Sequence, residues 1–161
     1  MNIEVGERVV VPGFGVGVVE AVEKMEVETT PVELYRIGFG EDGGHMWIPL
    51  DRMGAEGVRG VMSEERVAST WETIESTVAP EERANWNRRQ RRYNEALMSN
   101  QPKELAALIG ELGAVQARKP LSFGERKIFD KARSLLVAEI VAATGQEASV
   151  VETRMEQALA A

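Results

Sequence analysis

Residues 1–50 carry short runs of β-branched, aromatic and other apolar residues, separated by turn-forming residues. Gly, Pro, Asp and Asn between such runs are typical of turns that connect strands. The segment Gly40–Gly44 has three glycines around an acidic pair, which suits the positive φ angles of a hairpin. We therefore predict four or five short antiparallel strands that form a small, curled, barrel-like sheet. The apolar runs are Val9–Val11, Val16–Val22, Val32–Phe39 and Met46–Leu50.

From Ser63 onward the pattern changes to that of helices. Ser63 can cap a helix whose first turn contains two glutamates, and a proline suits the first position of a helix. Ser122 and Glu125 form a capping box, with Gly145 as a stop signal, and Ser149 and Glu152 repeat that pattern. Five helices are therefore predicted. Their expected bounds are Ser63 onward, Pro80 to about Ser99, Pro102 to about Lys119, Ser122 to about Gly145, and Ser149 onward.

The change of pattern falls at residues 50–62, where Gly54, Gly57 and Gly60 cluster. A small β module followed by an all-helical module is an α+β architecture. The expected boundary separates residues 1–60 from residues 61–161.

Charge is distributed unevenly along the 161 residues, whose net charge is −7. Residues 1–60 hold five basic and eleven acidic side chains, whereas residues 83–92 hold five arginines and no acid. Residues 118–133 hold six basic and two acidic side chains. A protein that coats DNA nonspecifically needs surplus Lys and Arg, so the net charge argues against that class. Two basic patches on an acidic protein instead predict local contact with an anion.

Several kinds of chemistry are not expected. The chain has no cysteine and one histidine, His45, so disulfides, a thiolate nucleophile, a catalytic triad and a multi-histidine metal site are not predicted. We interpret His45 as structural or merely exposed. The segment Gly13–Gly17 lacks the glycine spacing and the following helix of a nucleotide loop, and it is better read as a β-turn. We expect no enzyme activity and no cofactor. Without a signal peptide pattern or a long apolar run, a cytoplasmic protein is expected.

The segment Asn85–Tyr93 combines aromatic, amide and basic side chains. At helical spacing one stripe comprises Trp86, Gln90, Tyr93 and Leu97. One interpretation is therefore that Trp86 covers a hydrophobic core. The other starts from Arg88 and Arg92, which stand four residues apart, where like charges repel by roughly a few tenths of a kcal/mol. An anion facing both would remove that repulsion, and Trp86 would then act against bases as an aromatic wedge flanked by Arg.

A second basic patch lies at the start of the helix expected from Ser122. The buried stripe predicted for that helix comprises Phe129, Ala132, Leu136, Ile140 and Ala143. Phe123 lies off this stripe, on a face with Arg126 and Lys127. Because a helix start offers free N–H groups and partial positive charge, this face suits a phosphate. The alternative is that Phe123 packs against the helix that begins at Pro102.

Trp47 alternates with Met46 and Ile48 in an expected strand. If those two neighbours face the core, Trp47 points outward, and Pro49 would mark an edge strand because it cannot donate to a ladder. An exposed aromatic residue on a sheet edge suits strand pairing with a partner. The competing interpretation places Trp47 in an ordinary barrel core.

These segments resemble the CarD/CdnL family of bacterial transcription regulators. Val9–Gly17 is similar to the opening of these proteins, which the polymerase-interacting domain of the transcription-repair coupling factor shares. Ile48-Pro49 and Gly57–Arg59 continue the match. Trp86–Arg89 and Leu121–Lys127 resemble signature blocks of the family's helical domain. The blocks cover essentially the whole chain in the right order, and together they are specific.

The resemblance implies a Tudor-like N-terminal β barrel or sheet, followed by an all-helical C-terminal domain of about five helices. The first would bind the RNA polymerase β subunit by strand pairing, and the second would contact promoter DNA at the upstream edge of the melted region. In the family, a tryptophan matching Trp86 is a minor-groove wedge supported by a residue matching Arg88. The expected result is a longer-lived open complex.

Ten residues are candidates for these contacts. In the DNA set, Arg89 and Arg92 come from the first basic segment. The resemblance implies the other members. The DNA set comprises Trp86, Arg88, Arg89, Arg92, Phe123, Arg126 and Lys127. The polymerase set comprises Met25, Trp47 and Pro49.

The charge distribution is consistent with this function, since tethering to polymerase raises the effective concentration of a weak DNA patch. We expect a monomer with no membrane contact, associated with the nucleoid through polymerase. One rival hypothesis is an adaptor that binds polymerase while its basic patches serve helix packing. An enzyme is the other, and it has no motif in its support.

Overall fold

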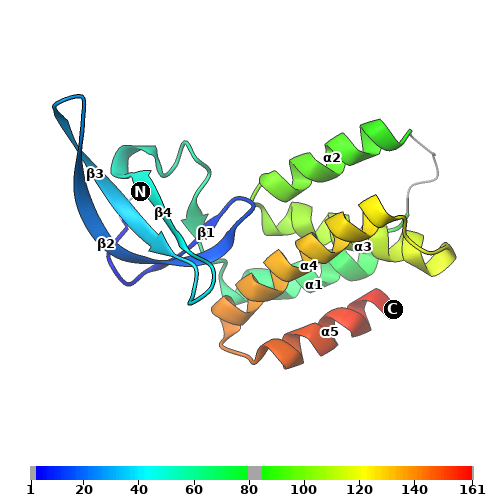
Figure 1. Cartoon of the computed structure of the whole chain (residues 1–161). Coiled ribbons are helices and arrows are strands. Elements are labelled where there is room, and N and C mark those ends of the chain that lie inside the picture. Colours follow the sequence, from blue (N-terminus) through cyan, green and yellow to red (C-terminus); the bar gives the residue numbers. More distant parts are fainter. Residues whose placement is uncertain (1–2, 80–84, 161) are drawn as a thin grey trace. The chain divides into compact units, whose positions relative to one another are not determined.

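A computed structural model describes residues 3–79 and 85–160 and divides the chain into two units, Met1–Val61 and Met62–Ala161. The first, here called the β unit, contains strands, and the second, the helical unit, contains helices (Figure 1). The α+β fold class predicted from the sequence is confirmed.

The β unit is built on one antiparallel sheet with the strand order β4-β3-β2-β1-β5. Strands β4 and β5 are therefore its edges. The position of β4 confirms the prediction made from Pro49. The strands are β1 (Arg8–Val11), β2 (Gly15–Val27), β3 (Thr30–Gly38), β4 (His45–Pro49) and β5 (Arg59–Gly60), with a 3₁₀ turn, η1, at Leu50–Arg52.

One face of this sheet forms the core of the β unit. Register places Val19 opposite Ile37 and Tyr35 opposite Ile48, and all four side chains are buried. The Tyr35 hydroxyl donates a hydrogen bond of 2.9 Å to the carbonyl of Ile3. Side chains alternate between the two faces of a strand. The residues between these buried positions therefore lie on the opposite face.

The β unit has one turn that the sequence predicts and one that it does not. Gly40 and Gly44 have φ angles of 87° and 75°, which confirms the predicted hairpin turn. Between β2 and β3, positive φ falls instead on Glu28 and Thr29, at 51° and 68°. Neither residue type signals a left-handed turn. As a result, β2 extends beyond the predicted run to Val27, and β3 begins before the predicted run at Thr30.

The five predicted helices are present, and two of their predicted starts are wrong. Asn85 is extended and its side chain caps α2, so no single helix runs from Pro80 to Ser99. Residues 80–84 lie outside the described residues. The fifth helix begins before Ser149, because the Glu147 carbonyl accepts its first hydrogen bonds. The helices are α1 (Glu64–Ser76), α2 (Trp86–Met98), α3 (Pro102–Arg118), α4 (Phe123–Thr144) and α5 (Ala148–Ala160).

Helix α4 contacts each of the other four helices and carries the centre of the helical core. Phe129, Ala132, Leu136 and Ile140 are almost completely buried, as predicted, whereas Ala143 is only partly buried. Glu139 on the same helix accepts a hydrogen bond of 2.8 Å from the Met62 N–H. The ends of α4 are fixed by a capping box at Ser122 and by left-handed Gly145. Helix α4 therefore positions the residues at its start.

Candidate functional sites

The N-terminus of α2 carries the first candidate residue, Trp86. The Asn85 side chain accepts a hydrogen bond of 2.9 Å from the Arg88 N–H, which fixes the start of the helix. Trp86 is the first helical residue, is partly buried and packs against the helical core. Tyr93, two turns further on, is buried at 1% exposure. Trp86 therefore packs on the core, as the first interpretation expects, while part of its ring still reaches solvent. Its role as a wedge stays a prediction.

The N-terminus of α4 carries the second candidate group. Ser122 and Glu125 form the predicted capping box, with bonds of 2.9 and 3.2 Å. Phe123 is 86% exposed, so the interpretation that it packs against α3 is wrong. Arg126 and Lys127 are exposed one turn further along α4. An exposed apolar ring thus lies at the positive end of a helix, followed by two cations.

These two helix starts meet at the Trp86 ring. A Cβ added to Gly124 would lie 2.7 Å from Cζ2 of Trp86, a distance that real Cβ contacts do not show. The Arg89 guanidinium lies 5.3 Å from the centre of the Trp86 ring, within range of a cation–π interaction. Its Nη1 donates to Glu125 Oε2 at 3.1 Å. Trp86 therefore lies against α4 while Arg89 joins α2 to that helix.

Glu125 is the charged centre of this junction. The carboxylate is buried at 3% exposure, which disfavours its charged form. Hydrogen bonds from Ser122, together with the hydrogen bond and charge of Arg89, outweigh that burial and lower the pKa of Glu125 below its ordinary 4.5. The carboxylate is therefore ionised at neutral pH and already fully engaged within the protein.

This lowered pKa predicts how stability depends on pH. Glu125 stabilises the folded chain above pH 4.5, and that contribution is lost as the pH falls through its lower folded pKa. We expect Glu125→Gln to reduce the free energy of unfolding at neutral pH, with a difference from wild type that shrinks on acidification. Urea unfolding of both proteins from neutral pH to below pH 4.5 measures this. A difference that stays constant with pH would contradict it.

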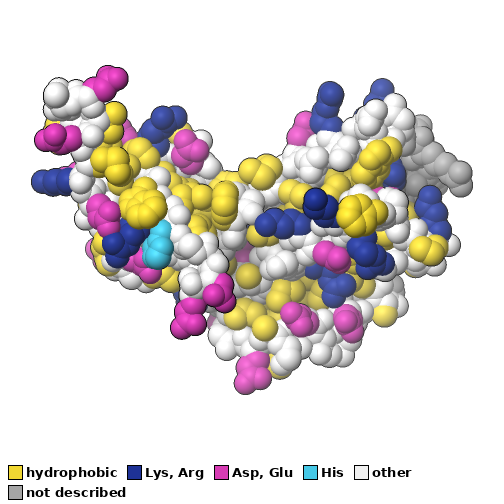
Figure 2. All heavy atoms as spheres, viewed as in Figure 1, with side chains coloured by type: hydrophobic (Ala, Val, Ile, Leu, Met, Phe, Trp, Pro, Cys, Tyr) yellow, Lys and Arg dark blue, Asp and Glu magenta, His cyan; other side chains and the backbone are white. Residues whose placement is uncertain are grey.

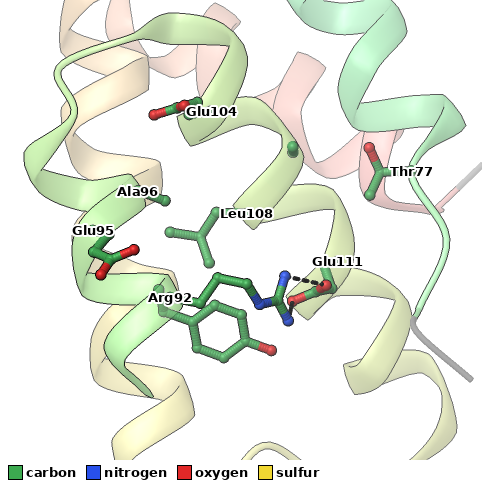
Figure 3. Close-up of a pocket in the computed structure, with 9 residues that line it drawn as sticks. Thr77, Arg92, Glu95, Ala96, Glu104, Leu108 and Glu111 are labelled. Atoms are coloured by element: carbon green, nitrogen blue, oxygen red, sulfur yellow. Dashed lines mark hydrogen bonds and ion pairs between the residues drawn. The ribbon is translucent and has the colours of Figure 1, made fainter. Parts of the chain in front are cut away.

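Arg92 also has a partner inside the protein. Its two terminal nitrogens donate to the two carboxylate oxygens of Glu111 on α3 at 3.0 and 3.1 Å (Figure 3). The hydrogen bond to Glu111 is the main reason that the pKa of Arg92 is raised. Burial raises the pKa of the neighbouring Tyr93 to about 12, which keeps the phenol protonated.

The Arg92 ion pair borders a pocket of about 330 Å³ between α2 and α3. Its lining includes three glutamates, Glu95, Glu104 and Glu111, against the single cation Arg92. Glu95 comes from α2, whereas Glu104 and Leu108 come from α3 (Figure 3). An acidic pocket repels a phosphate, so this side of α2 is not suited to DNA.

The remaining cations of the DNA set are exposed. Arg88, Arg126 and Lys127 form no ion pair within residues 3–79 and 85–160. Figure 2 shows Lys and Arg side chains gathered on one face of the helical unit around exposed apolar groups. The predicted set thus divides into three cations without an ion pair to a described residue and two, Arg89 and Arg92, that bind carboxylates of the protein, Arg92 with a side chain that stays 56% exposed.

The three residues of the polymerase set share one face of the sheet. Register pairs Trp47 with Arg36, Pro49 with Leu34, and Met25 with Val32, all on the face opposite to the core. Met25 is 51% exposed and Trp47 is 48% exposed, so the interpretation of Trp47 as barrel core is wrong. The face therefore presents apolar side chains beside the free edge of β4.

A polar network holds Trp47 in place on this face. Its Nε1 donates to Glu23 Oε2 at 3.0 Å, and Glu23 also pairs with Arg36. Arg36 reaches Glu20 at 3.3 Å, and Glu20 lies 2.9 Å from Nε2 of His45. His45 is thus exposed and joined to this network, within the expectation stated for it. The visible face of the β unit carries acidic side chains beside apolar ones (Figure 2).

Sequence reasoning missed the acceptors that organise these sites. Glu111, Glu125 and Glu23 each bind a residue of a predicted set from a different helix or strand. Of these three glutamates, only Glu125 stands in a recognisable motif, the capping box. That motif predicts the start of α4 and not the bond to Arg89 on α2. The sequence likewise did not predict the contact of Gly124 with Trp86. In the part of the chain that the structure describes, no cluster of His, Asp or Glu could hold a metal ion, and no helix is long and apolar enough to cross a membrane.

Comparison with known proteins agrees with this architecture. Residues 3–62 match the family described as the CarD-like/TRCF RID domain, and residues 70–156 match the CarD C-terminal domain. Together these matches define a transcription-associated protein that interacts with RNA polymerase. The chain belongs to the CarD family, a family of transcription factors that are not enzymes.

A bacterial protein has a low sequence identity to this chain over most of its length. The chain is 21% identical over 140 residues to a Bacillus subtilis (strain 168) protein named "Putative transcription factor YdeB". The similarity covers 85% of this chain and 89% of that protein, so both units are included.

Proposed function

We propose that this protein is a transcription regulator that binds the RNA polymerase β subunit through the β unit and promoter DNA through the helical unit. The helical unit contacts the minor groove at the upstream edge of the bubble. Trp86 acts there as a wedge that resists closing of the DNA and so stabilises the open complex. The observation that carries the proposal is the position of Trp86, at the start of α2 and against Gly124 in the first turn of α4, where Phe123, Arg126 and Lys127 are exposed.

Charge and exposure support this proposal. Three exposed cations can each approach a phosphate without giving up an ion pair to any residue that the structure describes. An acidic chain binds DNA weakly by itself, and docking on polymerase would supply the missing affinity through tethering. Because a wedge reads deformability and not base identity, promoter preference would follow the ease of distorting the DNA.

The polymerase contact is proposed for the edge formed by β4. An edge strand presents unpaired backbone groups that can extend a partner's sheet, and alternate side chains then set specificity. Trp47 provides a large aromatic contact next to that edge, with Met25 and Pro49 on the same face. Aromatic residues are enriched among those that dominate binding energy.

A polymerase-binding adaptor without direct DNA contact is the second candidate. The observation that favours it is the internal pairing of Arg89 with Glu125 and of Arg92 with Glu111. This pairing gives two residues of the basic segment a packing role.

Open-complex lifetime on a weak promoter, with the matching polymerase and a competitor challenge, separates the two candidates. We expect the wild-type protein to lengthen the lifetime, and the variant Arg88→Gln, Arg126→Gln, Lys127→Gln to lose most of that effect. Equal lengthening by both proteins would favour the adaptor. No lengthening by the wild type would contradict the proposed stabilisation.

A further inference from the structure

Arg89 belongs to the predicted DNA set, but its side chain is engaged inside the protein. Its side chain is 20% exposed, and its guanidinium lies between the Glu125 carboxylate and the Trp86 ring. If the Arg89 guanidinium turned toward a phosphate, the Glu125 carboxylate would lose this partner. Glu125 is only 3% exposed, so its charge would be left buried. Removing one partner of a buried ion pair is strongly unfavourable. Arg89 is therefore held where it is.

The Trp86 ring also lies against a glycine. The ring lies so close to Gly124 that a Cβ there would come within 2.7 Å of Cζ2 and within 3.3 Å of Cη2. Helix interiors disfavour glycine relative to alanine. A glycine in the first turn of α4 thus costs helix stability, and the space it leaves is occupied by the indole.

We propose that Gly124, Glu125 and Arg89 form a seat that fixes the orientation of the Trp86 indole, and that Arg89 is a positioning residue and not a phosphate contact. The proposal rests on the proposed function in that the indole is the part that meets DNA. A side chain that is already ordered loses less conformational freedom on insertion. The seat would therefore increase the effectiveness of the wedge without touching DNA.

The same geometry assigns the cations. Arg88, Arg126 and Lys127 would neutralise phosphates, whereas Arg89 and Arg92 would stay on Glu125 and Glu111. Each phosphate contact contributes about 0.9 to the slope of log K against log salt for duplex DNA. Substitutions in the two groups of cations are therefore expected to differ in their effect on this slope.

Gly124→Ala is the first test variant, because alanine favours the helix while its methyl group displaces the indole. The full-length protein labelled with 5-fluorotryptophan gives fluorine NMR resonances for Trp47, Trp71 and Trp86, which Trp→Phe variants assign. We expect the Trp86 resonance to shift or broaden while that of Trp71 is unchanged. Open-complex lifetime should fall toward the value of Trp86→Ala. An unmoved Trp86 resonance would overturn the proposal.

Glu125→Gln tests the seat from the other side. The glutamine amide oxygen can still accept from the Ser122 N–H, since Gln also serves in a capping box, but it lacks the second carboxylate oxygen that Arg89 uses. We expect a folded protein with a moved Trp86 resonance and a loss of lifetime extension. A Trp86 resonance and a lifetime identical to those of wild type would overturn the role of Glu125.

The salt dependence of binding to a short duplex, measured by NMR titration of the full chain, tests the assignment of Arg89. Arg88→Gln should lower the slope by about 0.9. Arg89→Gln should weaken binding at every salt concentration without changing the slope. An equal drop in slope for both variants would show that Arg89 contacts a phosphate, which overturns its positioning role.

These outcomes keep the seat and the proposed function apart. If Trp86→Ala leaves lifetime unchanged while Gly124→Ala moves the Trp86 resonance, the wedge fails and the seat remains as a packing feature only. If Trp86→Ala shortens lifetime while the seat variants change neither resonance nor lifetime, the function stands and the seat is overturned.

Discussion

Trp86→Ala is expected to remove most of the lengthening of open-complex lifetime that the wild-type protein produces. An aromatic contact with a base is worth about 1–3 kcal/mol by alanine substitution, which is about 5- to 150-fold in a rate constant. The side chain is partly exposed at the start of α2, so its removal leaves the fully buried core residues in place. The measurement is the decay of competitor-resistant complexes on a weak promoter.

The matched control for this prediction is Met98→Ala. Met98 lies at the other end of α2 and is 58% exposed, so it removes apolar surface from the same helix away from the proposed contact. Circular dichroism of both variants establishes that they are folded. If Trp86→Ala lengthens the lifetime as much as Met98→Ala and the wild type do, then the indole belongs to the core and polymerase contact is the active part.

Trp47→Ala is expected to weaken binding to RNA polymerase by at least about 30-fold, because an aromatic residue that dominates an interface contributes about 2 kcal/mol or more. Trp47 is half exposed and lies on the face opposite to the core, so folding should be little affected. Anisotropy of the fluorescently labelled protein, titrated with core polymerase, measures the affinity.

Val5→Ala is the matched control for the polymerase contact. Val5 is 57% exposed in the β unit and does not belong to the face that carries Met25, Trp47 and Pro49. It should bind polymerase as the wild type does. Equal affinity of Trp47→Ala and Val5→Ala would place the polymerase contact elsewhere on the β unit.

Local signals in the sequence were sufficient for most of the fold. The capping box at Ser122, the stop at Gly145 and the proline of β4 each act within a few residues, and each is confirmed. The start of α2 was misplaced because Pro80 and the capping residue Asn85 are both good start signals, and the sequence does not rank them. The turn at Glu28 and Thr29 carries no glycine signal.

The candidate sites were less accessible to sequence reasoning. Periodicity predicts which face of a helix is buried, and it correctly separated Phe123 from the stripe of Phe129 and Leu136. Periodicity does not predict which carboxylate forms an ion pair with a given arginine. Arg89 finds Glu125 thirty-six positions away, and Arg92 finds Glu111 nineteen positions away. Those pairings depend on how α2 packs on α3 and α4. Arginines that look alike in the sequence therefore differ in whether a carboxylate of the protein binds them.

Locating the start of α4 on the nucleic acid tests direct DNA contact by the helical unit. A photoreactive p-azidophenylalanine at position 123 replaces a ring that is 86% exposed, and the same residue at position 150, on α5, provides the control. After irradiation of the complete complex of polymerase, promoter and protein, we predict a crosslink from position 123 to DNA at the upstream edge of the bubble. Position 150 should give none there. Crosslinks from position 123 to polymerase alone, or no crosslink to DNA at all, would contradict direct DNA contact by the helical unit.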